Sequence, residues 1–101
     1  GSDVIKSESN GDISKIYNLL IQAEQTKVRV IGHTDNTGSS AVNLPLSKQR
    51  AQSVVKYLIN RGISRDRIQE VDGKGSSQPV SNNNTSSGRA SNRRVEITFL
   101  Q

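Results

Sequence analysis

The stretch that decides the fold is KVRVIGHTDNTG, residues 27–38. Its first half alternates at the start and contains three β-branched residues, which predicts a strand over residues 27–33. Its polar second half begins a segment rich in Asn, Ser, Thr and Gly, which we expect to be a loop over residues 34–45. Asp35 therefore follows the end of a strand, at an edge of the sheet where α/β proteins commonly bind ligands.

Two segments have the apolar spacing of amphipathic helices. Residues 12–25 and 46–61 repeat apolar side chains at intervals of three and four. Asp12 and Ser47 are the expected N-caps, and Gly62 is expected to end the second helix. The core is then predicted to contain Ile13, Ile16, Tyr17, Leu20 and Ile21 from the first helix, Ala51, Val54, Val55, Leu58 and Ile59 from the second, and Val28, Val30 and Ile31 from the strand between them.

Further strands are predicted before and after these helices. RIQEVDG, residues 67–73, alternates imperfectly, and RRVEITFLQ, residues 93–101, alternates regularly. A short strand or a loose tail is expected around Val4 and Ile5, and residues 74–92 are expected to be a long polar loop with room for one helical turn. This order predicts an α/β (α+β) domain, a two-layer sandwich in which the helices pack on one face of a βαβαββ-type mixed sheet.

The composition bounds the size and the partners of the domain. Of the 101 residues, Gly1-Ser2 is expected to be a scar of tag removal, which leaves one domain over residues 3–101. The chain has no cysteine, so disulfides, thiolate metal ligands and cysteine nucleophiles are excluded. The net charge of +5 favours an anionic partner, which would be nucleic acid, anionic lipid or a carboxylate-rich polymer, or simply reflects a soluble basic surface.

Asp35 and Arg50 are the residues whose placement suggests a binding site. Asp35 is either a turn-forming residue that bonds its own backbone or a ligand group. If Ser47 caps the second helix, Arg50 is its third residue, where a cation faces the positive end of the helix dipole at a cost of roughly 0.3–1 kcal/mol. Arg50 is then either solvated or paired with an anion, part of which Asp35 would supply. Together the two charges would match the ammonium and carboxylate of an amino-acid head group.

The remaining polar motifs do not indicate a reaction. His33 is the single histidine and is expected to brace the loop, because a metal would need further nitrogen or sulfur ligands. No serine lies in a nucleophile elbow, and GKGSS at residues 73–77 lacks the Walker spacing. Arg89, Arg93 and Arg94 either hold anions or decorate the start of a strand, and stacking aromatics for RNA are scarce. The sequence therefore predicts no metal, no cofactor and no enzymatic activity.

Several separated motifs lie between Val28 and Phe99. These motifs are GHTDNTG at 32–38, Asn43, LSKQRA at 46–51, Gly73, Gly75, Pro79, Asn83 and GRASNRRV at 88–95. In this order and spacing they resemble the OmpA-like C-terminal (peptidoglycan-binding) domain family, and the set is more specific than any single motif. The front of the chain, DVIKSESNGD at 3–12, departs from the family, whose members usually begin with a fuller strand that carries an aromatic residue.

The resemblance implies a ligand, a site and a location. It implies non-covalent binding of peptidoglycan through the meso-diaminopimelate of the stem peptide. It places the domain in the periplasm, where it anchors an outer-membrane protein or lipoprotein to the cell wall, with membrane contact only through other parts of the parent protein. A nucleic-acid-binding basic domain is the alternative, and an enzyme acting on the wall is a third hypothesis. By motif position, the implied ligand-binding residues are Asp35, Arg50, Asn43 and Arg93, with Thr34, Thr37 and Leu46 close to them.

Overall fold

The computed structural model describes residues 3–7, 10–23, 25–79 and 81–100, so the expected tag scar Gly1-Ser2 lies outside the described residues. Helices and strands alternate along the chain, as the sequence predicts. In chain order the elements are β1 (Asp3–Ser7), α1 (Asn10–Gln22), β2 (Lys27–Gly32), α2 (Ser40–Asn60), the 3-10 helix η1 (Arg65–Arg67), β3 (Ile68–Gly73), α3 (Ser86–Asn92) and β4 (Val95–Leu100).

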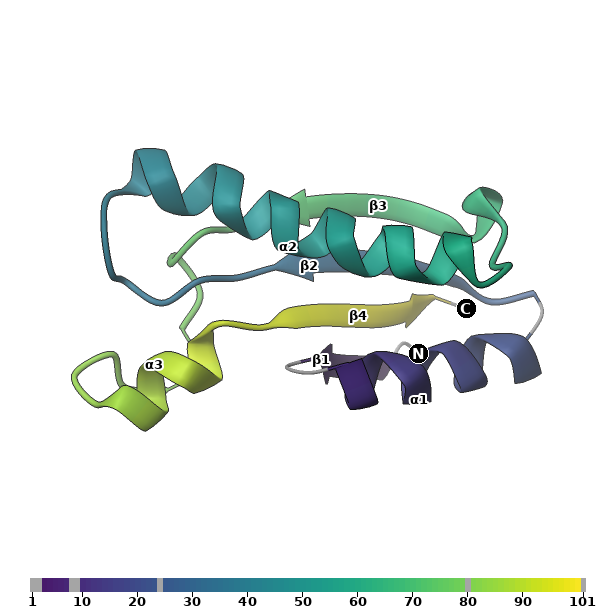
Figure 1. The fold of residues 1–101 in the computed structure, drawn as a ribbon, viewed down its shortest axis with the longest axis horizontal. Coiled ribbons are helices and arrows are strands. Elements are labelled where there is room, and N and C mark those ends of the chain that lie inside the picture. The colour runs from purple at the N-terminus through teal and green to yellow at the C-terminus, as the bar shows by residue number, and fades with distance from the viewer. Residues whose placement is uncertain (1–2, 8–9, 24, 80, 101) are drawn as a thin grey trace.

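The four strands form one mixed sheet with the order β1-β4-β2-β3. β4 pairs antiparallel with both β1 and β2, whereas β2 and β3 run parallel. In Figure 1, α2 runs over β2 and β3, and α1 lies beside β4 near β1. This arrangement confirms the predicted two-layer α/β sandwich, and the pairing of β1 with β4 shows that the front of the chain forms a strand in place of a loose tail.

The core lies between the helices and one face of the sheet. Side chains of a strand alternate between its two faces, so Val28 and Val30 are buried while Ile31 points to the opposite face and is half-buried, contrary to the prediction. Ile21 is 48% exposed on the outer side of α1, which corrects its assignment to the core. The side chain of the predicted core residue Ile13 lies outside the described residues. The other buried apolar residues are Ile16, Leu20, Ala51, Val54, Val55, Leu58, Ile63, Val95 and Ile97.

The start of α2 differs from the sequence prediction. The helix begins at Ser40, after the N-cap Ser39, so residues 40–45 are helical although they were expected to belong to a loop. Pro45 lies inside the helix, where its missing N–H and its ring normally disfavour helix. Tertiary contacts of the following turn override this preference. Ser47 is consequently a buried interior residue of α2 and not an N-cap.

The end of α2 agrees with the prediction. Gly62 follows the C-cap with a φ of +106°, a conformation that glycine adopts at little cost. Its N–H donates to the carbonyl of Ile59 at 3.0 Å, and the N–H of Ile63 donates to that of Leu58 at 3.1 Å. These two bonds form a Schellman motif, which satisfies carbonyls at the helix end.

Candidate ligand-binding site

Asp35 is the buried acidic residue of the loop that leaves β2. Its Oδ1 accepts a hydrogen bond from the backbone N–H of Thr37 at 2.8 Å, which confirms that it forms an Asx-type turn. Its Oδ2 lies 2.5 Å from Nη1 of Arg93, at the beginning of the segment that leads into β4. Each carboxylate oxygen therefore has a donor, and Asp35 joins its own turn to a residue 58 positions further along the chain.

The surroundings of Asp35 hold it in the charged form. Burial by itself raises the pKa of the carboxyl group, but the hydrogen bond from the Thr37 backbone and the nearby Arg93 guanidinium outweigh that effect. The net result is a pKa of Asp35 below its ordinary value. The site thus maintains a buried negative charge at neutral pH.

Three backbone or side-chain contacts fix the loop that carries Asp35. The N–H of His33 donates to the carbonyl of Arg94 at 2.7 Å, and the N–H of Thr34 donates to that of Gly75 at 2.9 Å. Asn43, buried in the first turns of α2, donates its Nδ2 to the backbone carbonyl of Asp35 at 3.4 Å. The loop is therefore tied to β4, to the segment after β3 and to α2.

Arg50 lies in the middle of α2, so it does not occupy the third helical position that the sequence predicted. The dipole argument for an anionic partner therefore does not hold. Among the described residues, Arg93 and not Arg50 is the arginine that pairs with Asp35. Arg50 is half-buried, and its Nε is inaccessible to water without a hydrogen-bond partner in the described part of the chain. A buried donor left unpaired costs free energy, so it is a candidate for contact with a ligand.

α2 approaches the sheet closely at Ser47, because two residues of the facing strands are glycines. Gly32 and Gly73 are paired in the β2–β3 ladder, and a Cβ at either position would overlap with Ser47. The Ser47 hydroxyl donates to the carbonyl of Leu44 at 2.7 Å and accepts from the N–H of Gly75 at 2.9 Å. Sequence reasoning missed this contact. The available signal was the glycine at the end of each of the two strands.

The remaining implied site residues surround Asp35 in the sequence but differ in exposure. Thr34 is buried, and no hydrogen-bond partner of its Oγ1 lies among the described residues. Thr37 is exposed, and its backbone N–H donates to the carboxylate of Asp35. Leu46 is exposed on α2, one helical turn before Arg50.

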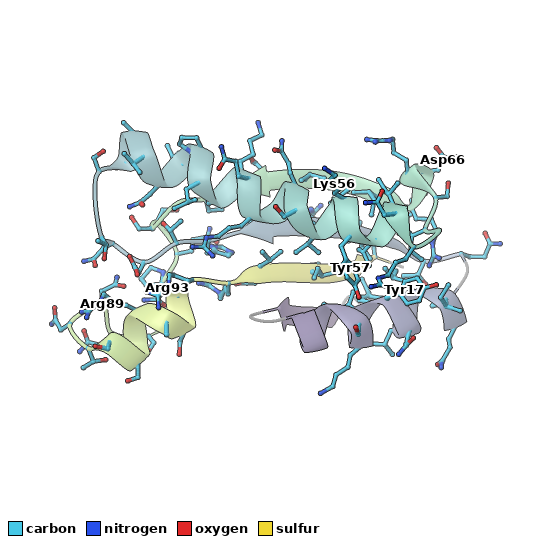
Figure 2. The ribbon with its side chains drawn as sticks, in the orientation of Figure 1. Tyr17, Lys56, Tyr57, Asp66, Arg89 and Arg93 are labelled. Carbon is cyan, nitrogen blue, oxygen red and sulfur yellow. The ribbon has the colours of Figure 1, made fainter. Side chains whose placement is uncertain are left out.

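The three arginines near the C-terminus do not form a free basic patch. Arg94 is buried and pairs with Glu96 at 2.7 Å, and it also donates to the carbonyl of Gln78 at 2.8 Å. Arg89 donates to the carbonyl of Asn83 at 2.9 Å. Figure 2 shows Arg89 and Arg93 on the same side of α3. Because these guanidinium groups are engaged within the domain, the cluster gives no support to a surface for nucleic-acid phosphates.

The other polar motifs have structural roles. The Nε2 of His33 lies 3.3 Å from Oε1 of Glu96, next to the Arg94–Glu96 pair, so His33 braces the strand exit as expected. In the described part of the chain, no group of three His, Cys, Asp or Glu residues is placed to hold a metal ion. Residues 73–77 line a hollow of ≈ 450 Å³ beside α2, and the N–H of Gly75 in that segment is bonded to Ser47.

The fold and the candidate site define a small α/β domain with a buried carboxylate, paired with an arginine, where β2 ends. The chain belongs to the OmpA family, whose sequence pattern matches residues 1–93. It is 46% identical over 85 residues to the peptidoglycan-binding protein ArfA of Mycobacterium tuberculosis, covering 84% of this chain and 26% of ArfA. It is 49% identical over 96 residues to outer membrane protein A of Bordetella avium, covering 95% of this chain and 49% of that protein.

A solved structure supports the same assignment. The cell wall anchor of the type VI secretion system from Pseudomonas aeruginosa superposes with a TM-score of 0.80 at 29% identity, covering 98% of this chain and 81% of that one. The chain spans about a quarter of the length of ArfA and about half of that of the Bordetella protein. The family assignment therefore concerns this domain. In the described residues, no helix is long and apolar enough to cross a membrane.

Proposed function

We propose that this domain binds peptidoglycan non-covalently through the meso-diaminopimelate of the stem peptide. Membership of the OmpA family supports the wall as the ligand, as do the similarities to a peptidoglycan-binding protein and to a cell wall anchor. The ligand group carries an ammonium and a carboxylate on one carbon. A site for it needs a buried anion beside a cationic donor, and Asp35 with Arg93 provides both.

The observation that carries the proposal is the buried, ionised carboxylate of Asp35, which pairs with Arg93 where β2 ends. Asp35 accepts hydrogen bonds from the ammonium of the ligand, and the guanidinium of Arg50 binds the carboxylate of the ligand. The Nε of Arg50 and the Oγ1 of Thr34 are buried without hydrogen-bond partners among the described residues. Ligand binding would satisfy such groups and recover the free energy that their burial costs.

Helix geometry supports the inclusion of Arg50 in the proposed site. Asn43 contacts the carbonyl of Asp35, and Arg50 follows it by seven residues, which places both on nearly the same side of α2. The separation along the helix axis is roughly 10 Å. Because helical side chains lean toward the N-terminus, we expect the long side chain of Arg50 to extend back toward Asn43 and Asp35.

The other implied residues complete the site in this proposal. Asn43 fixes the backbone carbonyl of Asp35, and Arg93 is a second cation, beside the carboxylate of Asp35. Thr34 contributes a buried hydroxyl, Thr37 lies at the exposed rim of the loop, and Leu46 offers an apolar contact beside Arg50. In the cell the domain would lie in the periplasm and attach a larger protein of the outer membrane to the wall, with the membrane contact made elsewhere in that protein.

A sedimentation assay with purified peptidoglycan tests this function. Asp35→Ala and Arg50→Ala should each abolish co-sedimentation, with a loss of roughly 2–5 kcal/mol for Arg50→Ala, because each leaves a buried charge of the complex without its partner. Asp66→Ala and Arg65→Ala are matched controls in η1, and Figure 2 shows Asp66 at the opposite end of the domain from Arg93. Wild-type sedimentation by folded Asp35→Ala and Arg50→Ala proteins would refute the proposed site.

A further inference from the structure

The carboxylate that is proposed to receive the ligand ammonium already has a cationic partner. Nη1 of Arg93 lies 2.5 Å from Oδ2 of Asp35. An ammonium that approaches Asp35 must therefore share the carboxylate with a guanidinium or displace it. This competition determines which ligands bind with a favourable free energy.

We propose that Arg93 is an exchangeable counter-ion of Asp35. When the ligand binds, Arg93 moves away from Asp35 and pairs with the carboxylate of the ligand. The exchange therefore selects ligands that carry a carboxylate beside the ammonium. This inference rests on the proposed function, because it assumes that the ligand ammonium binds at Asp35. It assigns to Arg93 a role in specificity as well as in contact.

The two partners differ in their freedom to move. The side chain of Asp35 is 8% exposed, and its Oδ1 is held by the N–H of Thr37. The side chain of Arg93 is 42% exposed. Its backbone is fixed, because its N–H donates to the carbonyl of Arg89 at 3.2 Å at the end of α3. Arg93 can therefore swing its guanidinium about a fixed Cα, while Asp35 stays in place.

The charge balance of the exchange explains the selectivity. A ligand with only an ammonium replaces one cation at Asp35 by another and leaves Arg93 without its anion. A ligand with an adjacent carboxylate gives Arg93 a new anion, and the planar guanidinium can hold it with two parallel hydrogen bonds. The first exchange changes the free energy of binding little. The second lowers it, because it adds a charge-assisted pair between Arg93 and the ligand carboxylate.

When Arg93 leaves Asp35, two other causes act to keep the carboxyl group ionised. The backbone hydrogen bond from Thr37 remains and independently lowers the pKa of Asp35. The incoming ammonium then replaces the positive charge of the guanidinium. Asp35 can thus remain an anion throughout the exchange.

Isothermal titration calorimetry with three tripeptides tests the inference. The probes are L-alanyl-γ-D-glutamyl-meso-diaminopimelate, the same peptide with the side-chain carboxylate amidated, and the peptide with L-lysine in place of diaminopimelate. The wild-type domain should prefer the first peptide by roughly tenfold or more over the other two. In Arg93→Gln this preference should shrink by roughly threefold or more but not vanish, because Arg50 still holds the carboxylate, and the lysine peptide should bind more tightly than it does to the wild type, because Asp35 no longer has an internal competitor.

Arg89→Gln is the matched control, since it removes the same charge one helical turn earlier and its side chain contacts Asn83 and not Asp35. It should keep the wild-type preference. An Arg93→Gln variant that loses the same factor for all three peptides, or that keeps the wild-type preference, would overturn the exchange while leaving the proposed function intact. A wild-type domain that binds none of the peptides would overturn the function and the exchange together.

Discussion

Gly32 and Gly73 face each other across the parallel ladder of β2 and β3, and neither position has room for a Cβ beneath Ser47. This pair of glycines lets α2 approach the strand ends closely. The same approach carries Asn43 to the carbonyl of Asp35. The geometry of the candidate site therefore depends on a backbone contact that contains no charged group.

Gly73→Ala should weaken both the fold and peptidoglycan binding. The added methyl group collides with Ser47 and with the backbone of Lys48, so we expect a loss of about 1–3 kcal/mol in the free energy of unfolding and a displacement of α2. Urea denaturation measures the first effect and co-sedimentation with peptidoglycan the second. Gly62→Ala is the control, because it strains a positive φ at the far end of α2. It should lower stability but retain binding, and equal binding by both variants would contradict the prediction.

Ser47→Ala isolates the hydrogen bonds of the same contact. The variant removes the acceptor of the Gly75 N–H, which lies at 2.9 Å in a buried segment. A buried donor without a partner costs about 1–3 kcal/mol, and we expect a loss of this size in the free energy of unfolding. Ser53→Ala, which removes an exposed hydroxyl bonded to Gln49 within the same helix, should change it by less than about 0.5 kcal/mol. Similar losses in the two variants would show that the Ser47 bond contributes little.

The sequence predicted the elements whose patterns are local. Regular alternation in residues 95–100 and the three-four spacing in α2 follow from burial on one face, and both agree with the structure. The predicted start of α2 was wrong, because Pro45 is a local signal against helix, whereas the contacts that favour helix at this position come from the sheet. Ser47 meets Gly32 and Gly73, which are distant in sequence, and no local pattern reveals that meeting.

The position of Asp35 after a strand could be predicted from the sequence, but the residue that pairs with it could not. Asp35 was singled out by its position after a strand, and the loop geometry agrees with a turn. The arginine that pairs with it was not identifiable from spacing, because Arg93 is 58 positions away and reaches Asp35 only through the order of the sheet. β4 lies beside β2, so the start of β4 meets the exit of β2. The family resemblance implied Arg93 as a ligand-binding residue, and the strand order explains why Arg93 lies beside Asp35.

The lowered pKa of Asp35 predicts a specific pH dependence of stability. A carboxyl group whose pKa is lower in the folded than in the unfolded state stabilises the fold above its unfolded pKa, which is about 3.9. That contribution is lost as the pH falls through the lower folded value. We therefore expect the stability difference between the wild type and Asp35→Asn to be constant near neutral pH and to change in favour of the variant below about pH 4. Urea titrations at several pH values measure it, and a difference that does not vary between pH 7 and acid would be inconsistent with the ionised buried carboxylate.

Glu96→Ala should be more destabilising than Glu70→Ala, although both remove the anion of an arginine pair. Glu96 lies 2.7 Å from Arg94, whose side chain is only 2% exposed, so its removal leaves a buried guanidinium without its anion. We expect a loss of about 3–5 kcal/mol in the free energy of unfolding. Glu70 pairs with Arg29 at the surface, where both side chains are more than 40% exposed, and its removal should cost about 0–1 kcal/mol.

Chemical denaturation of the two variants at pH 7 compares these losses directly. Glu96→Gln serves as a second variant, because it keeps an oxygen acceptor for Arg94 and removes only the charge, and it should lie between the wild type and Glu96→Ala. The contact of Glu96 with His33 adds to the loss, since His33 precedes the loop of Asp35. Glu96→Ala should therefore also weaken peptidoglycan binding at a temperature where it is still folded, whereas Glu70→Ala should not. Equal losses of stability in the two alanine variants would mean that the buried position of Arg94 does not raise the cost of leaving it unpaired.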